Sequence, residues 1–267
     1  MYKFKLGVVG AGFMATAIIE GAIKSNIVTP EQIIVCDIND LALEKISKIG
    51  VSTTKNSVDV ITLSEFVLLA VKPQNLSSIS VSGCAFDDKK IISIMAGVKK
   101  ERIKAVFKGA KVVRCMPNTP CSIGFGAVGV DVSDFENAKD VQFVLGLLSS
   151  FATVVRVSED KLNAVTGVSG SSPAYFYLFL KGIIDAGVKC GLDFEDAKML
   201  AVSTMIGAGE MVKKNLDKSI DQLIDAVCSK GGTTIEAVKV YNENNLTEIT
   251  QKAIDACVKR SKELENI

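Results

Sequence analysis

The sequence predicts an α/β fold, in which a doubly wound sheet domain is followed by an all-α C-terminal domain. Three observations lead to this prediction. Over residues 1–158, short apolar runs alternate with helical segments, which is typical of parallel strands covered by helices on both faces. A glycine-rich turn follows the first apolar run. Beyond Ser158, the strand-like runs stop and only helical patterns remain.

The first domain, residues 1–158, is expected to contain eight strands. They are predicted at residues 4–9, 32–37, 51–54, 66–71, 90–95, 112–116, 127–132 and 153–157. Helices fit between them, for example at residues 41–49 and 137–151. Because most of the runs are continuously apolar, we expect parallel pairing in a sheet that is buried on both faces.

The second domain, residues 159–267, is expected to be helical throughout. Helices are predicted within residues 160–190 and at residues 195–215, 219–227, 233–242 and 246–264. Several of them are apolar on more than one face, and roughly 110 residues cannot bury that much apolar surface alone. We therefore expect a dimer formed through this domain; packing against the sheet domain is the alternative.

Composition limits the partners and the location. Among 267 residues, 48% are hydrophobic and the net charge is +1, so no basic surface suggests nucleic acid. No apolar run approaches the ~20 residues of a membrane span. Three glycines interrupt the N-terminal apolar run, which argues against a signal peptide. The seven cysteines form no C-x-x-C pair, so we expect reduced, mostly buried thiols, no metal site and a cytoplasmic protein.

Histidine is absent from the chain. Its absence excludes a histidine general base, a Ser–His pair and histidine metal ligands. Because many alcohol dehydrogenases use histidine, we expect a substrate that needs little acid–base help.

The turn after the first strand carries the sequence Gly10-Ala11-Gly12-Phe13-Met14-Ala15. This G-x-G-x-x-A pattern, between a strand and a helix that begins near Gly12, is the fingerprint of a Rossmann dinucleotide-binding domain. Gly10 allows the tight turn, Gly12 lets the backbone approach a pyrophosphate, and Ala15 permits close packing of the helix. The free N–H groups at the helix start bind the anion.

Asp37 ends the second predicted strand, 25 residues after Gly12. An acidic residue about 20 residues beyond the glycine turn accepts hydrogen bonds from the adenosine ribose. A carboxylate there also repels a 2′-phosphate, which favours NADH over NADPH. The alternative is that Asp37 caps the helix that begins near Asp40.

Four further motifs lie at strand ends or helix starts: AVKPQ from Ala70, CMPNTP from Cys115, SGSSPAY from Ser169 and GGTT from Gly231. In this order, together with the glycine turn, they resemble the pyrroline-5-carboxylate reductase family over essentially the whole chain. The resemblance implies NAD(P)H-dependent reduction of 1-pyrroline-5-carboxylate to L-proline, the last step of proline biosynthesis. It also implies a Rossmann domain, a helical dimerisation domain, and dimers that often assemble into a ring.

The resemblance also implies which residues form the site. The implied cofactor contacts are Val9, Gly10, Ala11, Gly12, Phe13, Met14, Asp37, Asn56, Ala70, Val71, Lys72, Pro73, Met95, Ala96 and Gly97. The implied substrate contacts are Asn118, Ser171, Ser172, Gly231, Gly232, Thr233 and Thr234.

Several of these residues could instead have a purely structural role. Lys72 is either a catalytic acid or a solvated lysine, Asn56 either touches adenosine or caps a helix, and Asn118 either orients a ligand or forms a turn. Two positions depart from the family pattern, because Ser172 stands where glycine is common and Lys230 where proline is common. Position 37 varies in the family, in which many members prefer NADPH.

The implied substrate is a cyclic imine with a carboxylate, so the enzyme needs mainly proximity and orientation. We expect the backbone amides of Gly231, Gly232 and Thr233 to bind the carboxylate at a helix N-terminus. The Thr234 hydroxyl would hydrogen-bond the ring nitrogen, which makes Thr234 the expected catalytic residue. The alternative is a capping box between Thr233 and Glu236.

Two other functions fit the same architecture. A β-hydroxyacid or ketoacid reductase would place a G-x-x-x-K-x-x-N pattern on the first helix of the second domain, and the region around Lys161 and Lys181 lacks it. A non-catalytic NAD(P)-binding regulator would be expected to have lost Thr234 or the glycine pair, and both are present.

Overall fold

The computed structural model describes residues 2–87 and 89–265. The chain divides into two compact units, one formed by Met1–Pro173 with Cys257–Ile267 and the other by Ala174–Ala256. We call them the sheet unit and the helical unit. The end of the last helix therefore belongs to the sheet unit, as does the segment between Ser158 and Pro173, whereas the sequence suggested a single boundary after Ser158.

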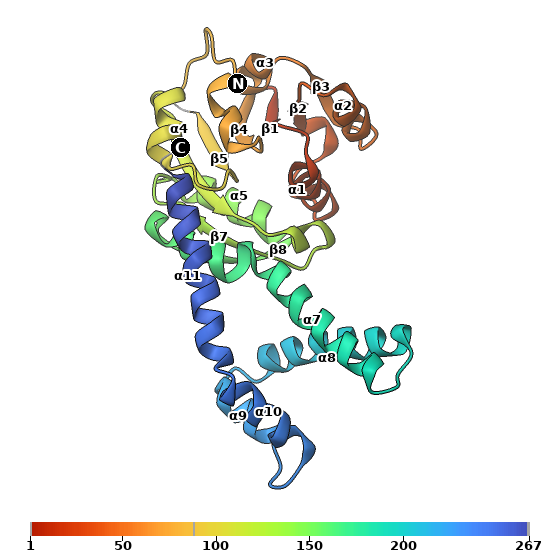
Figure 1. The fold of residues 1–267 in the computed structure, drawn as a ribbon. Coiled ribbons are helices and arrows are strands. Elements are labelled where there is room, and N and C mark those ends of the chain that lie inside the picture. The colour runs from red at the N-terminus through yellow and green to blue at the C-terminus, as the bar shows by residue number, and fades with distance from the viewer. Residues whose placement is uncertain (1, 88, 266–267) are drawn as a thin grey trace. The chain divides into compact units, whose positions relative to one another are not determined.

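The sheet unit is built on an eight-stranded sheet in the order β3-β2-β1-β4-β5-β6-β7-β8 (Figure 1). The predicted strand ends differ from the observed ones by at most two residues. The strands are β1 (Phe4–Val9), β2 (Ile33–Cys36), β3 (Ser52–Thr54), β4 (Ser64–Leu69), β5 (Lys90–Ser93), β6 (Lys111–Met116), β7 (Gly126–Asp131) and β8 (Ala152–Arg156).

Parallel pairing holds for all neighbouring strands except β6 and β7, which are antiparallel. The expectation of parallel strands was wrong at this point. The reason is the length of the connection, since only residues 117–125 join the two strands and a parallel crossover needs a dozen or more residues. A short 3-10 helix, Thr119–Ile123, fills this connection.

Both faces of the sheet are covered, as a doubly wound fold requires. In β2, Ile33 and Val35 enter one buried cluster, while Ile34 and Cys36 enter the other. Helices α1 (Phe13–Lys24), α2 (Asp40–Ser47) and α5 (Ala138–Ser149) contribute to the first cluster. Helices α3 (Ser57–Leu63) and α4 (Lys100–Val106) contribute to the second. In open α/β sheets of this kind, ligands bind at the loops beyond the carboxyl ends of the strands.

Helices follow the sheet along the rest of the chain (Figure 1). They are α6 (Leu162–Val165), a π-helical turn (Thr166–Gly170), α7 (Ser172–Lys189), α8 (Phe194–Lys214), α9 (Ile220–Val227), α10 (Thr233–Glu243) and α11 (Leu246–Leu264). The predicted ends of the last helix are confirmed. Within residues 2–87 and 89–265, no helix combines the length and the apolar character that crossing a membrane would take.

The cysteines are all free, but their burial differs from the expectation. Cys36, Cys115 and Cys121 are buried, Cys190 is exposed, and the other three are half-buried. Most of the thiols are therefore not core side chains. The three buried ones lie on the sheet or on the short helix that follows β6.

Candidate active site

The turn after β1 requires glycine at one position and leaves open space at another. Gly10 has a φ of +103°, and a Cβ atom there would lie 2.7 Å from the carbonyl oxygen of Ala70. Gly12 is the N-cap of α1 and makes no side-chain cap, and a Cβ at Gly12 would meet nothing within 4 Å. The first N–H groups of α1 have no partner inside the helix. The turn can therefore accept the pyrophosphate of a dinucleotide against bare backbone.

Asp37 is fixed beside this turn. Its Oδ2 accepts a hydrogen bond of 2.7 Å from the Ala11 backbone N–H, and its Oδ1 accepts one of 2.8 Å from the Asn39 N–H. The N-cap of α2 is Asn39, whose side chain accepts from the N–H groups of Leu41 and Ala42. The alternative that Asp37 caps this helix was therefore wrong. The carboxylate joins the end of β2 to the glycine turn.

Further predicted cofactor residues follow β4, which pairs with β1, and β5, which pairs with β4. The Ala70 N–H donates to the Val9 carbonyl at 2.9 Å, so these two strand ends meet directly. Lys72 is exposed, as a solvated lysine would be, and Pro73 begins a 3-10 helix. Met95 is buried, and Gly97 has a φ of +68°.

Two further predicted cofactor residues, Asn56 and Phe13, stand at the starts of helices α3 and α1. The Asn56 Oδ1 accepts from the Val58 N–H, so this residue caps α3. Its Nδ2 donates to Asp59 at 3.2 Å. Phe13, the first residue of α1, is 65% exposed, and its neighbour Met14 packs partly against the core.

Asn118 and the serine motif contact each other. The Asn118 Nδ2 donates to the Ser169 carbonyl at 3.2 Å, and its Oδ1 accepts from the Ala127 N–H at 3.0 Å. Asn118 is 9% exposed. Its amide thus ties the loop after β6 to the start of β7 and to the π-helical turn. This is the contact pattern of a residue that sets the position of a loop.

The two serines of the motif have different partners. The Ser172 hydroxyl is directed to the carbonyl oxygens of Gly167 and Val168, at 3.0 and 2.6 Å, and the side chain is buried. The Ser171 Oγ accepts from the thiol of Cys257 at 3.4 Å. The single hydroxyl proton of Ser172 is therefore committed to the backbone.

In the helical unit, the GGTT motif forms a tight turn before α10. Gly231 has a φ of +73°, and a Cβ at Gly232 would lie 2.4 Å from the Ser229 hydroxyl. Gly232 is the N-cap of α10 and the helix has no side-chain cap. The alternative capping box between Thr233 and Glu236 was therefore wrong. Thr233 and Thr234 are exposed in the first turn of the helix.

Two family models match this chain. Residues 159–264 match the family described as pyrroline-5-carboxylate reductase dimerisation. Residues 5–97 match the family described as NADP oxidoreductase, coenzyme F420-dependent. The pyrroline-5-carboxylate reductase of Haemophilus influenzae is 37% identical over 263 residues, covering 97% of both chains. That of Methanosarcina acetivorans is 34% identical and covers 99% of both.

The chain belongs to the pyrroline-5-carboxylate reductase family.

Solved structures agree with this family and with the fold. The pyrroline-5-carboxylate reductase of Coxiella burnetii has a TM-score of 0.89 at 32% identity, over 98% of both chains. The Plasmodium falciparum pyrroline carboxylate reductase with NADP bound has a TM-score of 0.85 at 29% identity, over 99% of both chains. The predicted family, the reductase class and the fold of a Rossmann domain followed by a helical dimerisation domain are confirmed.

The buried thiols near the sheet of this reductase are poor nucleophiles. Burial raises the pKa of the Cys36 thiol to about 12, and burial also raises the pKa of Cys115 and Cys121. All three therefore stay protonated at neutral pH. In the part of the chain that the structure describes, no group of three or more His, Cys, Asp or Glu side chains is placed to hold a metal ion.

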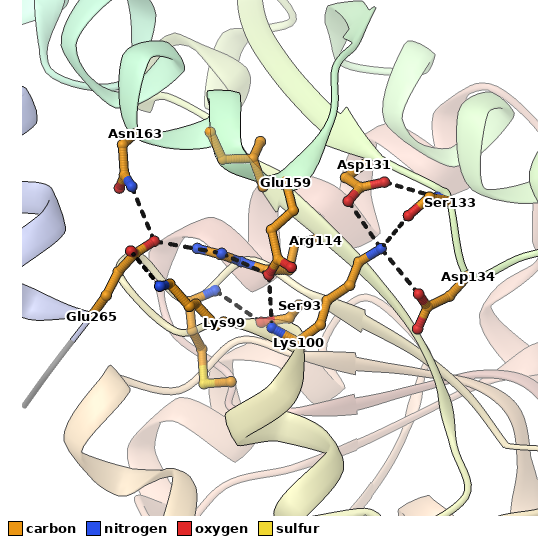
Figure 2. A network of polar contacts seen from close by, with 12 residues as sticks. Ser93, Lys99, Lys100, Arg114, Asp131, Ser133, Asp134, Glu159, Asn163 and Glu265 are labelled. Atoms are coloured by element: carbon orange, nitrogen blue, oxygen red, sulfur yellow. Dashed lines mark hydrogen bonds and ion pairs between the residues drawn. The ribbon is translucent and has the colours of Figure 1, made fainter.

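A buried polar network beside the sheet was missed from the sequence (Figure 2). Arg114 lies in the middle of β6, and its NH1 donates to Glu159 at 2.9 Å. The same atom lies 3.8 Å from a carboxylate oxygen of Glu265, at the end of α11. An arginine within the apolar run KVVRCM was the available signal, since a buried charge needs a partner. The sequence does not reveal that the partner comes from the far end of the chain.

A second part of the network surrounds Lys100, at the start of α4 (Figure 2). Its ammonium lies 3.0 Å from Asp131 and 3.3 Å from Asp134. Burial acts to raise the pKa of Asp131, but the Ser133 backbone N–H and the Lys100 ammonium outweigh it, so this pKa lies below its ordinary value. Asp134 has a lowered pKa for similar reasons, with Lys104 as its main partner.

Proposed function

We propose that this chain reduces 1-pyrroline-5-carboxylate to L-proline with NAD(P)H. The observation that carries the proposal is the full-length identity to curated enzymes of that name, 37% over 263 residues. The glycine turn supports it, because its geometry fits a dinucleotide. The absence of histidine also fits, since an iminium carbon is already a good hydride acceptor and needs little acid–base help.

The cofactor supplies the hydride when it is bound, and the chain binds and orients it. We propose that Gly10 to Met14 hold the pyrophosphate on the N–H groups at the start of α1. Asp37 would take the adenosine ribose and Asn56 the adenine side. Ala70 to Pro73 and Met95 to Gly97, at the ends of β4 and β5, would line the nicotinamide half.

Within the same proposal, Asp37 gives a preference for NADH. Its carboxylate is held by the N–H groups of Ala11 and Asn39, so it cannot easily swing away from a ribose phosphate. A fixed negative charge disfavours the 2′-phosphate of NADPH through like-charge repulsion. We expect a higher kcat/KM for NADH, and a shift toward NADPH of about tenfold in Asp37→Ser. A clear NADPH preference of the unmodified protein would refute this assignment.

For the substrate, we propose that the turn before α10 binds the carboxylate. The Gly232 N–H already donates to the Ser229 carbonyl at 2.9 Å, so the N–H groups proposed for the carboxylate are those from Thr233 onward, at the positive end of the helix dipole. The N-cap has no side chain to occupy them. The exposed hydroxyl of Thr234 then donates to, or accepts from, the ring nitrogen. Of the two serines, Ser171 is the proposed substrate contact, because the proton of Ser172 is directed to backbone carbonyls.

Thr234 is tested by two substitutions. Thr234→Ala should lower kcat/KM for pyrroline-5-carboxylate by about tenfold, the scale of one lost hydrogen bond. Thr234→Ser keeps a hydroxyl and should stay within about threefold of the unmodified protein. Equal kinetics for all three proteins would remove Thr234 from the mechanism.

We also propose that the protein is a cytoplasmic homodimer, formed through the helices of the helical unit, with dimers able to assemble into a ring. The match of residues 159–264 to a dimerisation family supports the dimer. Exposed apolar side chains support it as well, including Leu178 at 73% and Ile206 at 63% exposure. Seven free thiols are compatible with the cytoplasm.

A further inference from the structure

The end of α11 lies against two loops of the sheet unit that are far from it in sequence. A Cβ atom at Gly97, in the loop after β5, would be 3.0 Å from the Leu264 Cβ. About two helical turns earlier, the Cys257 thiol donates to the Ser171 hydroxyl at 3.4 Å. The same short stretch of helix therefore contacts both the loop assigned to the nicotinamide and the turn assigned to the substrate.

Asn163 forms two side-chain hydrogen bonds with the end of α11 and the residue after it. Its Oδ1 accepts a hydrogen bond of 2.7 Å from Ser261, and its Nδ2 donates one of 3.0 Å to Glu265. Asn163 and Ser261 are 6% and 5% exposed. Asn163 belongs to α6, which runs directly into the π-helical turn. Both ends of one buried amide are thus held by α11, and the turn that follows it is held with them.

Glu265 extends the contact to the cofactor side (Figure 2). Its side chain is 8% exposed, and one carboxylate oxygen lies 3.3 Å from the ammonium of Lys99, the N-cap of α4. Lys99 is two residues beyond Gly97. The other oxygen lies 3.8 Å from Arg114 on β6. Glu265 is therefore a single carboxylate shared by the loop after β5, by β6 and by α6.

We propose that Glu265 and Ser261 are positioning residues, and that the end of α11 is a brace that holds the Met95–Gly97 loop and the Ser169–Ser172 turn at their working positions. The proposal rests on the proposed function, in which these two segments carry the cofactor and the substrate. Hydride transfer is sensitive to placement, since an error of ~1 Å can cost about 100-fold in rate. A brace that joins both segments would act on the rate rather than on either affinity.

The test compares Glu265→Ala with Glu263→Ala in the full-length protein. Glu263 is the matched control, because it lies two residues away and pairs only with Arg260 among the contacts described, at 47% and 62% side-chain exposure. For Glu265→Ala, we expect kcat to fall about tenfold while the KM values for NAD(P)H and pyrroline-5-carboxylate change less than about threefold. Glu263→Ala should behave as the unmodified protein.

Two further variants separate positioning from folding. Glu265→Gln keeps an acceptor for Asn163 and should recover most of kcat. Ser261→Ala removes one hydroxyl and should lower kcat by about threefold without unfolding the protein. Hydrogen exchange should quicken at residues 94–98 and 166–172 in Glu265→Ala, to a smaller extent in Ser261→Ala, and not at all in Glu263→Ala.

The brace is overturned if Glu265→Ala lowers the melting temperature but leaves kcat within about twofold. If Glu265→Ala does not fold, the same criterion applies to Ser261→Ala. Unchanged exchange in both segments also overturns it. If the unmodified protein does not reduce pyrroline-5-carboxylate, the proposed function fails by itself. Exchange of the two segments, measured with and without NAD(P)H, then still decides the brace.

Discussion

The sheet unit and the helical unit place their apolar side chains in opposite ways. In the sheet unit, two large clusters of buried residues lie on the two faces of the sheet. In the helical unit, the described core consists of Ile184, Ala197 and Ala201, with Leu180 partly buried against them. The sheet unit thus forms its core within the chain, whereas the helical unit exposes apolar surface that the proposed second copy would cover.

The largest expected effect comes from charging that surface. Leu178 on α7 and Ile206 on α8 are both exposed in the single chain. In the proposed dimer, the double variant Leu178→Glu, Ile206→Glu would bury two unpaired charges from each copy in the interface. We expect the dimer dissociation constant to rise by about a thousandfold or more. Light scattering after size exclusion measures it.

The control for this variant lies in the sheet unit. Leu41 on α2 is 75% exposed, and Leu41→Glu should leave the oligomeric state unchanged. A double variant that remains dimeric at the same concentrations would show that the exposed faces of α7 and α8 are not the interface.

The next effect tests the interior of the sheet unit. Lys100→Met leaves Asp131 and Asp134 without the ammonium that lies 3.0 and 3.3 Å away. Removing one partner of a buried ion pair costs about 3–5 kcal/mol, so the urea midpoint should fall sharply. Adding Asp131→Asn to this variant should restore part of the loss. A loss below about 1 kcal/mol would mean that the network is solvated, as surface pairs are.

The two glycines of the turn after β1 should respond differently to alanine. At Gly10, the positive φ and the 2.7 Å approach to Ala70 predict a loss of about 3 kcal/mol in the free energy of unfolding. At Gly12, a Cβ meets nothing within 4 Å, so stability should change by less than about 0.5 kcal/mol while NAD(P)H affinity falls about tenfold. Denaturant unfolding and cofactor titration of both variants separate the two roles. Equal stability losses would contradict them.

The smallest effect concerns Lys89, whose ammonium donates to the Ser64 carbonyl at 2.6 Å. Burial lowers the pKa of Lys89 from 10.5 to about 8. Between these values the unfolded chain binds more protons than the native one, so stability rises with pH. Relative to Lys89→Met, the unmodified protein should gain about 2 kcal/mol between pH 8 and 10. Lys108→Met, at an exposed lysine, serves as control; parallel pH curves for Lys89→Met and unmodified protein would argue against the shift.

The fold of the sheet unit could be predicted from the sequence because short local patterns mark its strands and its first turn. Short β-rich runs, most of them continuously apolar, located all eight strands of the described sheet, and the glycine turn located the start of α1. The antiparallel β7 was not foreseen, because strand direction depends on the length of the loop after β6 rather than on the strand itself. The extent of the sheet unit was not foreseen either, since nothing near Cys257 indicates that the chain returns to residues 1–173.

In the candidate site, the sequence predicted those positions at which a motif needs glycine for its backbone conformation or for open space. Gly10, Gly12 and Gly231 have the conformations or the open space that their motifs demand. Side-chain partners were harder to foresee. Asn118 contacts Ser169, 51 residues away, and Glu265 contacts Asn163, 102 residues away. Such contacts are set by packing, and a single sequence carries no local signal of them apart from a charged residue in an apolar run.

The most direct test of the central claim is the oxidation of NADH and NADPH by the purified protein on addition of 1-pyrroline-5-carboxylate, with a 2-keto acid as the control substrate. We predict rapid oxidation with pyrroline-5-carboxylate, formation of L-proline in equal amount, and no oxidation with the keto acid. Oxidation with the keto acid alone would indicate a hydroxyacid-type reductase. Cofactor binding without oxidation of either kind would contradict the assignment of a reductase and indicate a protein that only binds the dinucleotide.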